Sequence, residues 1–177
     1  MKSSLLLLLL LSTGAWAQAP KGNYQGQGIE MSVSVRNAEQ LRAFYGARGL
    51  PAEAVTEITR HCFITVGIYN GRKDILWLEP ENWRVIDIDG KDIPRVSRQA
   101  WEEKWEKLKV PDASRATFGW TLLPESRDLQ PDEPVGGNFV IVATQESFTL
   151  QTSFATGKDK KGRPAKVSFS GLRCLTP

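Results

Sequence analysis

The residues that could act as a nucleophile and a base are few, and their spacing does not suit covalent catalysis. His61 is the single histidine of the chain, and it directly precedes Cys62, one of only two cysteines. Adjacent side chains in a strand point to opposite faces, so these two residues cannot act as a catalytic pair within a strand. No serine stands in the G-x-S-x-G arrangement that presents a nucleophile on a sharp turn. We therefore expect no catalytic residues and a protein that is not an enzyme.

Metal ligands are similarly sparse. Zinc and copper sites draw on several histidine, cysteine, methionine or carboxylate ligands, and beyond Met1 this chain offers one histidine, one methionine and two cysteines. Residues 125–133 place several acidic side chains in one loop, and oxygen ligands suit calcium. Arg127 interrupts this set, and the spacing is not that of an EF-hand. We interpret the loop as charged and solvated, with calcium binding as the alternative, and expect no metal site and no cofactor.

Aromatic side chains give the strongest indication of a binding surface. Aromatic rings, tryptophan and tyrosine above all, are enriched at interfaces because a flat amphipathic ring buries much area at a small entropic cost. Two tryptophans flank a Glu-Pro-Glu-Asn corner, and two aromatics stand beside an arginine near a predicted helix end. We take five residues as candidate partner-binding residues, with packing in the core as the alternative for each: Phe44, Tyr45, Arg48, Trp77 and Trp83.

The first seventeen residues have the three parts of a secretory signal peptide. Lys2 supplies the positive charge, residues 5–11 are all leucine, and Ala15 and Ala17 have the small side chains of a cleavage site. The leucine run is much shorter than the roughly 20 apolar residues that span a bilayer. No cysteine follows the predicted cleavage point to carry a lipid. We predict an exported protein without a membrane span or a lipid anchor.

Export changes the interpretation of the two cysteines. Cysteines of an exported chain are more often bridged than free, and no C-x-x-C pair indicates a redox site. A bond between Cys62 and Cys174 closes a loop of about 110 residues and contributes about 4–5 kcal/mol in the chain-entropy model. We predict this disulfide.

The charge pattern argues against a nucleic-acid partner. The 23 basic and 20 acidic residues are mixed along the chain, whereas nucleic-acid binders concentrate basic residues on one face. The basic cluster at residues 158–163 contains Asp159 and Gly162, and we interpret it as a solvated hairpin loop.

Periodicity predicts one mainly β domain over residues 29–177, preceded by a flexible lead-in at 18–28. Apolar residues alternate from Ile29 and again, most strongly, in residues 62–69. Helical insertions are expected near residues 38–60 and 98–108, the second with Trp101 and Trp105 on a face that packs on the sheets. Further strands are predicted at 75–78, 83–88, 118–123, 138–143, 148–154 and 165–170, with a long loop at 124–137. Many short strands with turns between them are typical of an antiparallel β-sandwich.

Three segments resemble a group of bacterial exported proteins with an immunoglobulin-like β-sandwich. They share an asparagine at the end of a core strand, a D-x-D-G turn and an L-x-P-x-E-x-x-x-G loop. The resemblance implies an immunoglobulin-like β-sandwich and a periplasmic location, with secretion as the alternative; it implies no activity. The short helical insertions are predicted from the sequence pattern, and the one near residues 38–60 departs from a minimal sandwich of this kind. The matching residues are Asn70, Asp87, Asp89, Gly90, Leu129, Pro131, Glu133 and Gly137.

These observations favour an exported, non-catalytic binding or accessory module that acts on another protein or an envelope component. Recognition in such proteins is usually carried by the connections between the elements of a stable scaffold. One alternative is an inhibitor of a secreted or periplasmic enzyme, with loop 124–137 as the inserting segment. Another is a carbohydrate- or calcium-dependent site that uses the loop carboxylates and the tryptophans.

Overall fold

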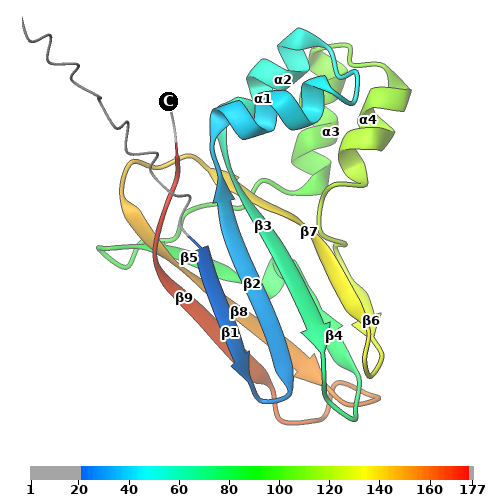
Figure 1. Cartoon of the computed structure of the whole chain (residues 1–177), viewed down its shortest axis with the longest axis vertical. Coiled ribbons are helices and arrows are strands. Elements are labelled where there is room, and N and C mark those ends of the chain that lie inside the picture. The colour runs from blue at the N-terminus through cyan, green and yellow to red at the C-terminus, as the bar shows by residue number, and fades with distance from the viewer. Residues whose placement is uncertain (1–20, 176–177) are drawn as a thin grey trace, which may run out of the picture.

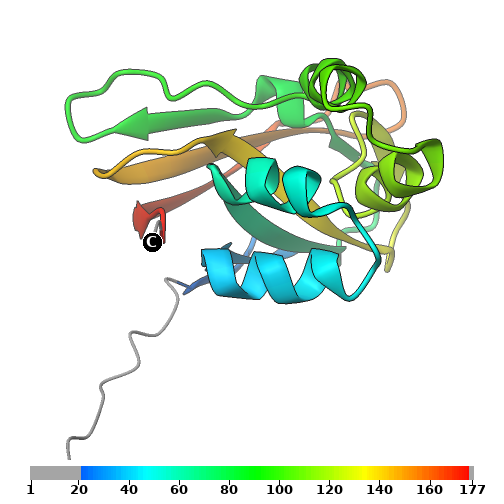
Figure 2. The ribbon, with the colours of Figure 1, turned by 90° about the horizontal axis from the view of Figure 1, so that it is seen from above.

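The computed structural model describes residues 21–175, in which two antiparallel β-sheets face each other and four helices close one end (Figure 1). The predicted signal peptide, residues 1–17, lies outside the described residues. Viewed from the helical end, the sheets form two layers with the helices beside them (Figure 2). Within residues 21–175, no helix is long and apolar enough to cross a membrane.

The first sheet, called sheet 1, has the strand order β1-β2-β3-β7. Its alternating strands confirm the periodicity of the sequence, since Ile29, Met31, Val33 and Val35 are all buried on one face of β2. The opposite face of the sheet carries the odd-numbered residues of β3 and the even-numbered residues of β7, which we call the outer face. The strands are β1 (Lys21–Gly26), β2 (Ile29–Arg36), β3 (His61–Asn70) and β7 (Pro134–Val142).

Strand β1 corrects the expected flexible lead-in at residues 18–28. Residues 21–26 pair with β2 in antiparallel register, from Lys21 opposite Ser34 to Gly26 opposite Ile29. Gln27 and Gly28 both have positive φ angles, 53° and 71°, which suit a tight two-residue hairpin turn. The pairing uses backbone groups, so the polar, glycine-rich composition of this segment did not indicate it.

The second sheet, sheet 2, has the order β5-β8-β4-β6, and β9 also pairs with β8. The expected long loop at 124–137 is therefore interrupted, because its residues enter β6 and the first half of β7. A short 3₁₀ helix, Pro80–Asn82, connects β4 to β5. The strands are β4 (Leu76–Leu78), β5 (Arg84–Asp87), β6 (Arg127–Leu129), β8 (Ser147–Thr156) and β9 (Ala165–Arg173).

The main core lies between the two sheets. Trp83 is 5% exposed there, with its ring centroid 5.3 Å from that of Phe139 in sheet 1 and 5.7 Å from that of Phe154 in sheet 2. The predicted mostly β architecture is confirmed as two antiparallel sheets with four helices. The immunoglobulin-like topology stays a prediction.

The helices come as two pairs, α1 (Ala38–Gly46) with α2 (Ala52–Thr59) and α3 (Arg98–Lys107) with α4 (Asp112–Gly119). A capping box starts α1, because the side chains of Asn37 and Gln40 each accept a hydrogen bond from the other's backbone N–H. Ser97 caps α3. The two predicted helical insertions thus agree with the structure in position.

Helix α4 corrects the strand expected at residues 118–123. Phe118 lies in the last turn of α4 and packs against Trp101 and Trp105, with centroid distances of 4.8 and 4.9 Å. Leu122 forms only an isolated bridge, to Asn138. A short apolar run does not distinguish a strand from a buried helix end by its periodicity, and here tertiary packing selects the helix.

A second core joins the helices to the outer face of sheet 1. Trp101 and Trp105 are fully buried, stacked at 4.9 Å, as the helix pattern predicted. The sheet contributes Phe63 and Val140 to this cluster. The molecule therefore has a sandwich core and a helical core on opposite faces of the same strands.

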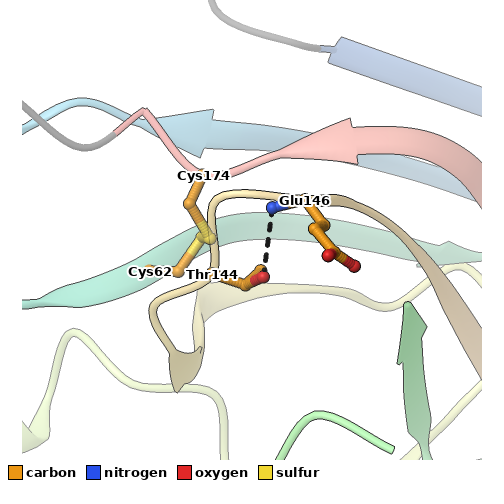
Figure 3. The surroundings of a disulfide bond; sticks show 4 residues. All are labelled: Cys62, Thr144, Glu146 and Cys174. Carbon is orange, nitrogen blue, oxygen red and sulfur yellow. Dashed lines mark hydrogen bonds between the residues drawn. A yellow bond between two sulfur atoms is a disulfide. The ribbon is translucent and has the colours of Figure 1, made fainter. Parts of the chain in front are cut away.

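The predicted disulfide is confirmed. Cys62 in β3 and Cys174 after β9 are bonded across 112 positions of sequence, with their Cα atoms 5.4 Å apart. The bridge ties sheet 1 to the last strand of sheet 2 beside the turn in which the N–H of Glu146 donates to Thr144 Oγ1 (Figure 3). A structural disulfide is typical of an extracytoplasmic protein.

His61 predicts a loss of stability on mild acidification. Its ring packs on Trp101 at 4.8 Å, and Nδ1 lies 3.0 Å from the carbonyl of Glu57, to which it donates. Burial lowers the pKa of His61, and the positive charges of Lys104 and Arg60 act in the same direction, although the Glu57 carbonyl and carboxylate oppose them. The unfolded chain therefore binds more protons below pH 6.5, so the folded state loses stability as the pH falls from 6.5 towards the lowered pKa.

Urea titrations at pH 7.5 and 5.0 test this expectation. The pKa of Glu57 is also shifted: burial opposes ionisation, but the hydrogen bond and charge of Lys104 outweigh it and hold the pKa below 4.5. Glu57 therefore stays mostly ionised between these two pH values. We expect His61→Gln to lose less stability than the wild type between the two pH values. An equal loss in both proteins would contradict the assignment.

Candidate functional site

A pocket of about 460 Å³ opens where α1 and the end of α4 meet the outer face of sheet 1. Its floor comes from the sheet, and its rim comes from the helices. No aspartate or glutamate is among the lining residues, and Arg36 is the charged residue of the set. The pocket is lined by Arg36, Gln40, Leu41, Phe44, Tyr45, Thr65, Trp120, Thr121, Gly136, Gly137 and Asn138.

Tyr45 and Thr121 form the inner end of a directional hydrogen-bond chain. Thr121 Oγ1 donates to the carbonyl of Phe118 at 2.7 Å, so its hydrogen is already used and it accepts from the Tyr45 hydroxyl at 2.8 Å. The Tyr45 oxygen in turn accepts from Asn138 Nδ2 at 3.3 Å. Burial raises the pKa of Tyr45 to about 12, against the opposing effect of these hydrogen bonds, so the phenol stays neutral and keeps its proton.

Arg36 forms the outer end of the same chain. Its Nε donates to Thr65 Oγ1 at 2.8 Å, and that hydroxyl donates to Asn138 Oδ1 at 2.8 Å. The bond from Thr65 fixes the amide of Asn138 with its oxygen towards β3 and its nitrogen towards Tyr45. Arg36, Thr65 and Asn138 come from the neighbouring strands β2, β3 and β7, where register places Thr65 opposite Asn138.

The rim of the pocket is aromatic and exposed. Trp120, which directly follows α4, is 90% exposed, and Phe44 on α1 is 40% exposed. The guanidinium of Arg48 lies 3.4 Å from the centroid of the Phe44 ring and donates to the Phe44 carbonyl at 2.9 Å. This cation–π contact holds Phe44 at the helix end.

Gly137 allows the segment after Trp120 to lie against β7. A Cβ at residue 137 would be 2.6 Å from the backbone nitrogen of Leu123. Because residue 137 is glycine and has no Cβ, the two backbones can pair: Leu123 N donates to the carbonyl of Asn138 at 3.1 Å, and Asn138 N donates to the carbonyl of Thr121 at 2.8 Å. The glycine that resembled a turn marker in the sequence therefore permits a close backbone approach that positions the rim.

The structure brings together three of the five candidate partner-binding residues. Phe44 and Tyr45 line the pocket, and Arg48 packs on Phe44. Trp77 lies elsewhere, half-buried, with Nε1 donating to the carbonyl of Gly157 at 2.8 Å. Trp83 is in the sandwich core, so its side chain offers no surface to a partner.

Sequence reasoning missed Arg36 and Trp120. The sequence could have identified Arg36, because the alternation of β2, continued past Val35, places it on the outer face of sheet 1. Trp120 was assigned to a strand that does not form, and its exposure depends on where α4 ends.

The acidic side chains of residues 125–133 turn to separate partners. Glu125 accepts from Arg95 Nη2 at 2.6 Å, and Asp132 accepts from the Tyr69 hydroxyl at 2.8 Å. The backbone N–H of Gln130 and the side chain of Arg127 bond Glu133 and lower its pKa. These contacts give no support to the calcium alternative in this loop.

A different acidic group lies at the β5 turn, where carboxylate oxygens of Asp87, Asp89 and Glu146 come within 4.8 Å of one another. Asp87 Oδ1 accepts from the backbone N–H groups of Asp89 and Lys91, at 2.9 Å each. These bonds organise the turn itself.

No protein-family model and no curated protein sequence matches this chain. Two solved structures from Bacillus subtilis are similar to it. The candidate lipoprotein YcdA has a TM-score of 0.40 at 15% identity, over 63% of this chain, which thereby spans 29% of YcdA. The YjhA protein has a TM-score of 0.42 at 13% identity, over 73% of this chain and 76% of YjhA. The fold and the site define a disulfide-bonded, mostly β protein with one polar-floored, aromatic-rimmed pocket beside its helices.

Proposed function

We propose that this protein is an exported, non-catalytic binding module that recognises another protein or an envelope component through the pocket between α1, α4 and sheet 1. The observation that carries the proposal is the 90% exposure of Trp120 on the pocket rim. Exposing a large aromatic ring forgoes hydrophobic stabilisation, and tryptophan, tyrosine and arginine dominate the binding energy of protein interfaces. Trp101, Trp105 and Trp83, by contrast, are buried in the two cores.

The neighbours of Trp120 support the same proposal. Phe44 extends the apolar rim, and Arg48 stacks on it. Below the rim, the hydrogen-bond chain from Arg36 to Thr121 fixes the polar side chains of the floor before a ligand arrives. A floor with fixed side chains loses little entropy on binding, which favours affinity.

The location is part of the proposal. The predicted signal peptide and the disulfide support export, with a bacterial periplasm as the proposed compartment and secretion as the alternative. The resemblance to exported immunoglobulin-like proteins supports an Ig-like topology for the sandwich. In this view the sandwich is the scaffold, and the helical end carries recognition.

Affinity capture from the native envelope tests the proposed function. The immobilised protein would be compared with Trp120→Ala and with Ile88→Ala, a matched control that removes another exposed apolar side chain (70% exposed) that does not line the pocket. We expect a partner that the wild type and Ile88→Ala retain and Trp120→Ala retains at least about tenfold less, as for a central interface tryptophan. Equal capture by Trp120→Ala, or no specific partner for the wild type, would refute the proposal.

A further inference from the structure

The hydrogens that stay free on the polar side chains of the pocket floor belong to Arg36 and Asn138. The hydroxyl hydrogens of Thr65, Tyr45 and Thr121 are all consumed within the chain of bonds described above. Arg36 uses Nε for Thr65, and its Nη1 and Nη2 groups have no partner among residues 21–175. The Asn138 amide nitrogen carries a second hydrogen beyond the one given to Tyr45. A ligand that completes this floor must supply acceptors.

Charge narrows the class of ligand further. Arg36 makes no ion pair with any residue in the described part of the chain, and no acidic side chain lines the pocket. The paired Nη1 and Nη2 groups form one edge of the guanidinium fork, whose geometry matches the two oxygens of a carboxylate. The acceptor that fits this floor is therefore an anion with two such oxygens, a carboxylate or a phosphate. Of these two, the carboxylate is the group that an unmodified protein partner carries.

Apart from Gln40, the side chains on the helix side of the pocket are mainly apolar. Leu41, Phe44 and the indole of Trp120 line the side opposite the sheet. The volume of about 460 Å³ falls in the range of roughly 300–1,000 Å³ that is usual for pockets that enclose a small group. A pocket of this volume accommodates one or two terminal residues of a polypeptide but not a whole helix. The ligand therefore joins a carboxylate to an apolar group over a short distance.

The last residue of a polypeptide has this composition when its side chain is apolar, because carboxylate and side chain share one Cα. An internal aspartate or glutamate carries a carboxylate but no apolar group on the same side chain. We infer that the pocket captures the free C-terminus of a partner protein that ends in an apolar residue, with Arg36 on the carboxylate and Trp120 and Phe44 on the side chain. This inference rests on the proposed function and names the part of the partner that is recognised.

Peptide binding measured by fluorescence anisotropy tests the inference. The probes are N-terminally labelled peptides ending in Phe, Leu or Trp, each made with a free C-terminal carboxylate and with a C-terminal amide. We expect at least one free acid to bind the full mature protein and its amide to bind about 10- to 100-fold more weakly, as for loss of a charged hydrogen bond. Trp120→Ala should weaken the binding of that acid.

Arg36→Gln provides the decisive comparison, and Arg42→Gln is its matched control. Arg42 is an exposed residue of α1 that does not line the pocket, so its loss removes the same charge nearby. We expect Arg36→Gln to erase the preference for acid over amide and Arg42→Gln to keep it. Thermal unfolding of both variants verifies that they are folded.

Three outcomes would overturn the inference: equal binding of acid and amide, an equal effect of the two arginine substitutions, or no binding of any peptide. These failures are distinct from failure of the proposed function. If the wild type still captures an envelope partner in a Trp120-dependent way, the pocket remains a binding site and only the terminal carboxylate is wrong. If capture does not depend on Trp120, the proposed function itself fails.

Discussion

Reducing the Cys62–Cys174 bond is expected to lower the free energy of unfolding by about 4–5 kcal/mol. The bond closes a loop of more than a hundred residues, so breaking it restores much conformational entropy to the unfolded chain. It also joins β3, an inner strand of sheet 1, to the segment that follows the last strand. Because small domains are stable by only about 5–15 kcal/mol, a loss of this size is a large share of the total.

Equilibrium urea unfolding with and without a reductant gives the measurement. A Cys62→Ala/Cys174→Ala variant is the matched control, because Cys62 is 2% exposed and serine would place an extra hydroxyl in the apolar core. The reduced wild type and the alanine variant should unfold at similar, lower urea concentrations. A reduced protein within about 1 kcal/mol of the oxidised one would show that the chain-entropy model overstates this bond.

The parts of the fold that the sequence predicted correctly are those governed by local rules. The alternation in residues 62–69 predicted the strand β3, whose Ile64 and Val66 lie in the sandwich core, and the helical insertion expected near residues 38–60 contains α1 and α2. The spacing of Trp101 and Trp105 identified one buried helix face. In each case side chains a few residues apart determine the outcome, so no knowledge of distant contacts is needed.

The errors concern residues whose environment is set by distant partners. Trp120 directly follows α4, so its exposure depends on how Phe118 of α4 packs in the helical core. The burial of Trp83 depends on Phe139, far along the chain. The sequence composition does not distinguish Trp120 from Trp83, although the first is on the surface and the second is in the core. The pocket was found only in part for the same reason, since α1 supplied recognisable aromatics while the floor is assembled from three strands.

The site lies on the boundary between the two cores. On the outer face of sheet 1, Phe63 and Val140 are covered by helices, whereas Thr65 and Asn138, the next outward residues of the same strands, are at the pocket floor. The helical core thus determines where the cover ends and the pocket begins. A substitution in the helical core should therefore alter the pocket even though the substituted residue does not line it.

Trp101→Ala is therefore expected to destabilise the protein by about 3–5 kcal/mol and to loosen the pocket rim. Trp101 is fully buried and contacts Phe118 at 4.8 Å, and the carbonyl of Phe118 receives the last bond of the floor, from Thr121. Urea unfolding measures the global loss. Amide hydrogen exchange of α4 and residues 121–123 under native conditions measures the local loss of stability at the pocket rim.

Trp83→Ala is the matched control, because it removes the same side chain from the sandwich core. Neither indole nitrogen has a hydrogen-bond partner among the described residues, so both substitutions act through packing and cavity formation. We expect the two variants to lose similar amounts of unfolding free energy. Only Trp101→Ala should show faster amide exchange of α4 and residues 121–123, and only this variant should bind more weakly at the pocket. If Trp101→Ala does not fold, Trp101→Phe keeps an aromatic ring and should show the same local pattern at a smaller amplitude. The same exchange pattern from both cores would mean that the molecule opens as a single unit and that the helical core has no separate control over the pocket.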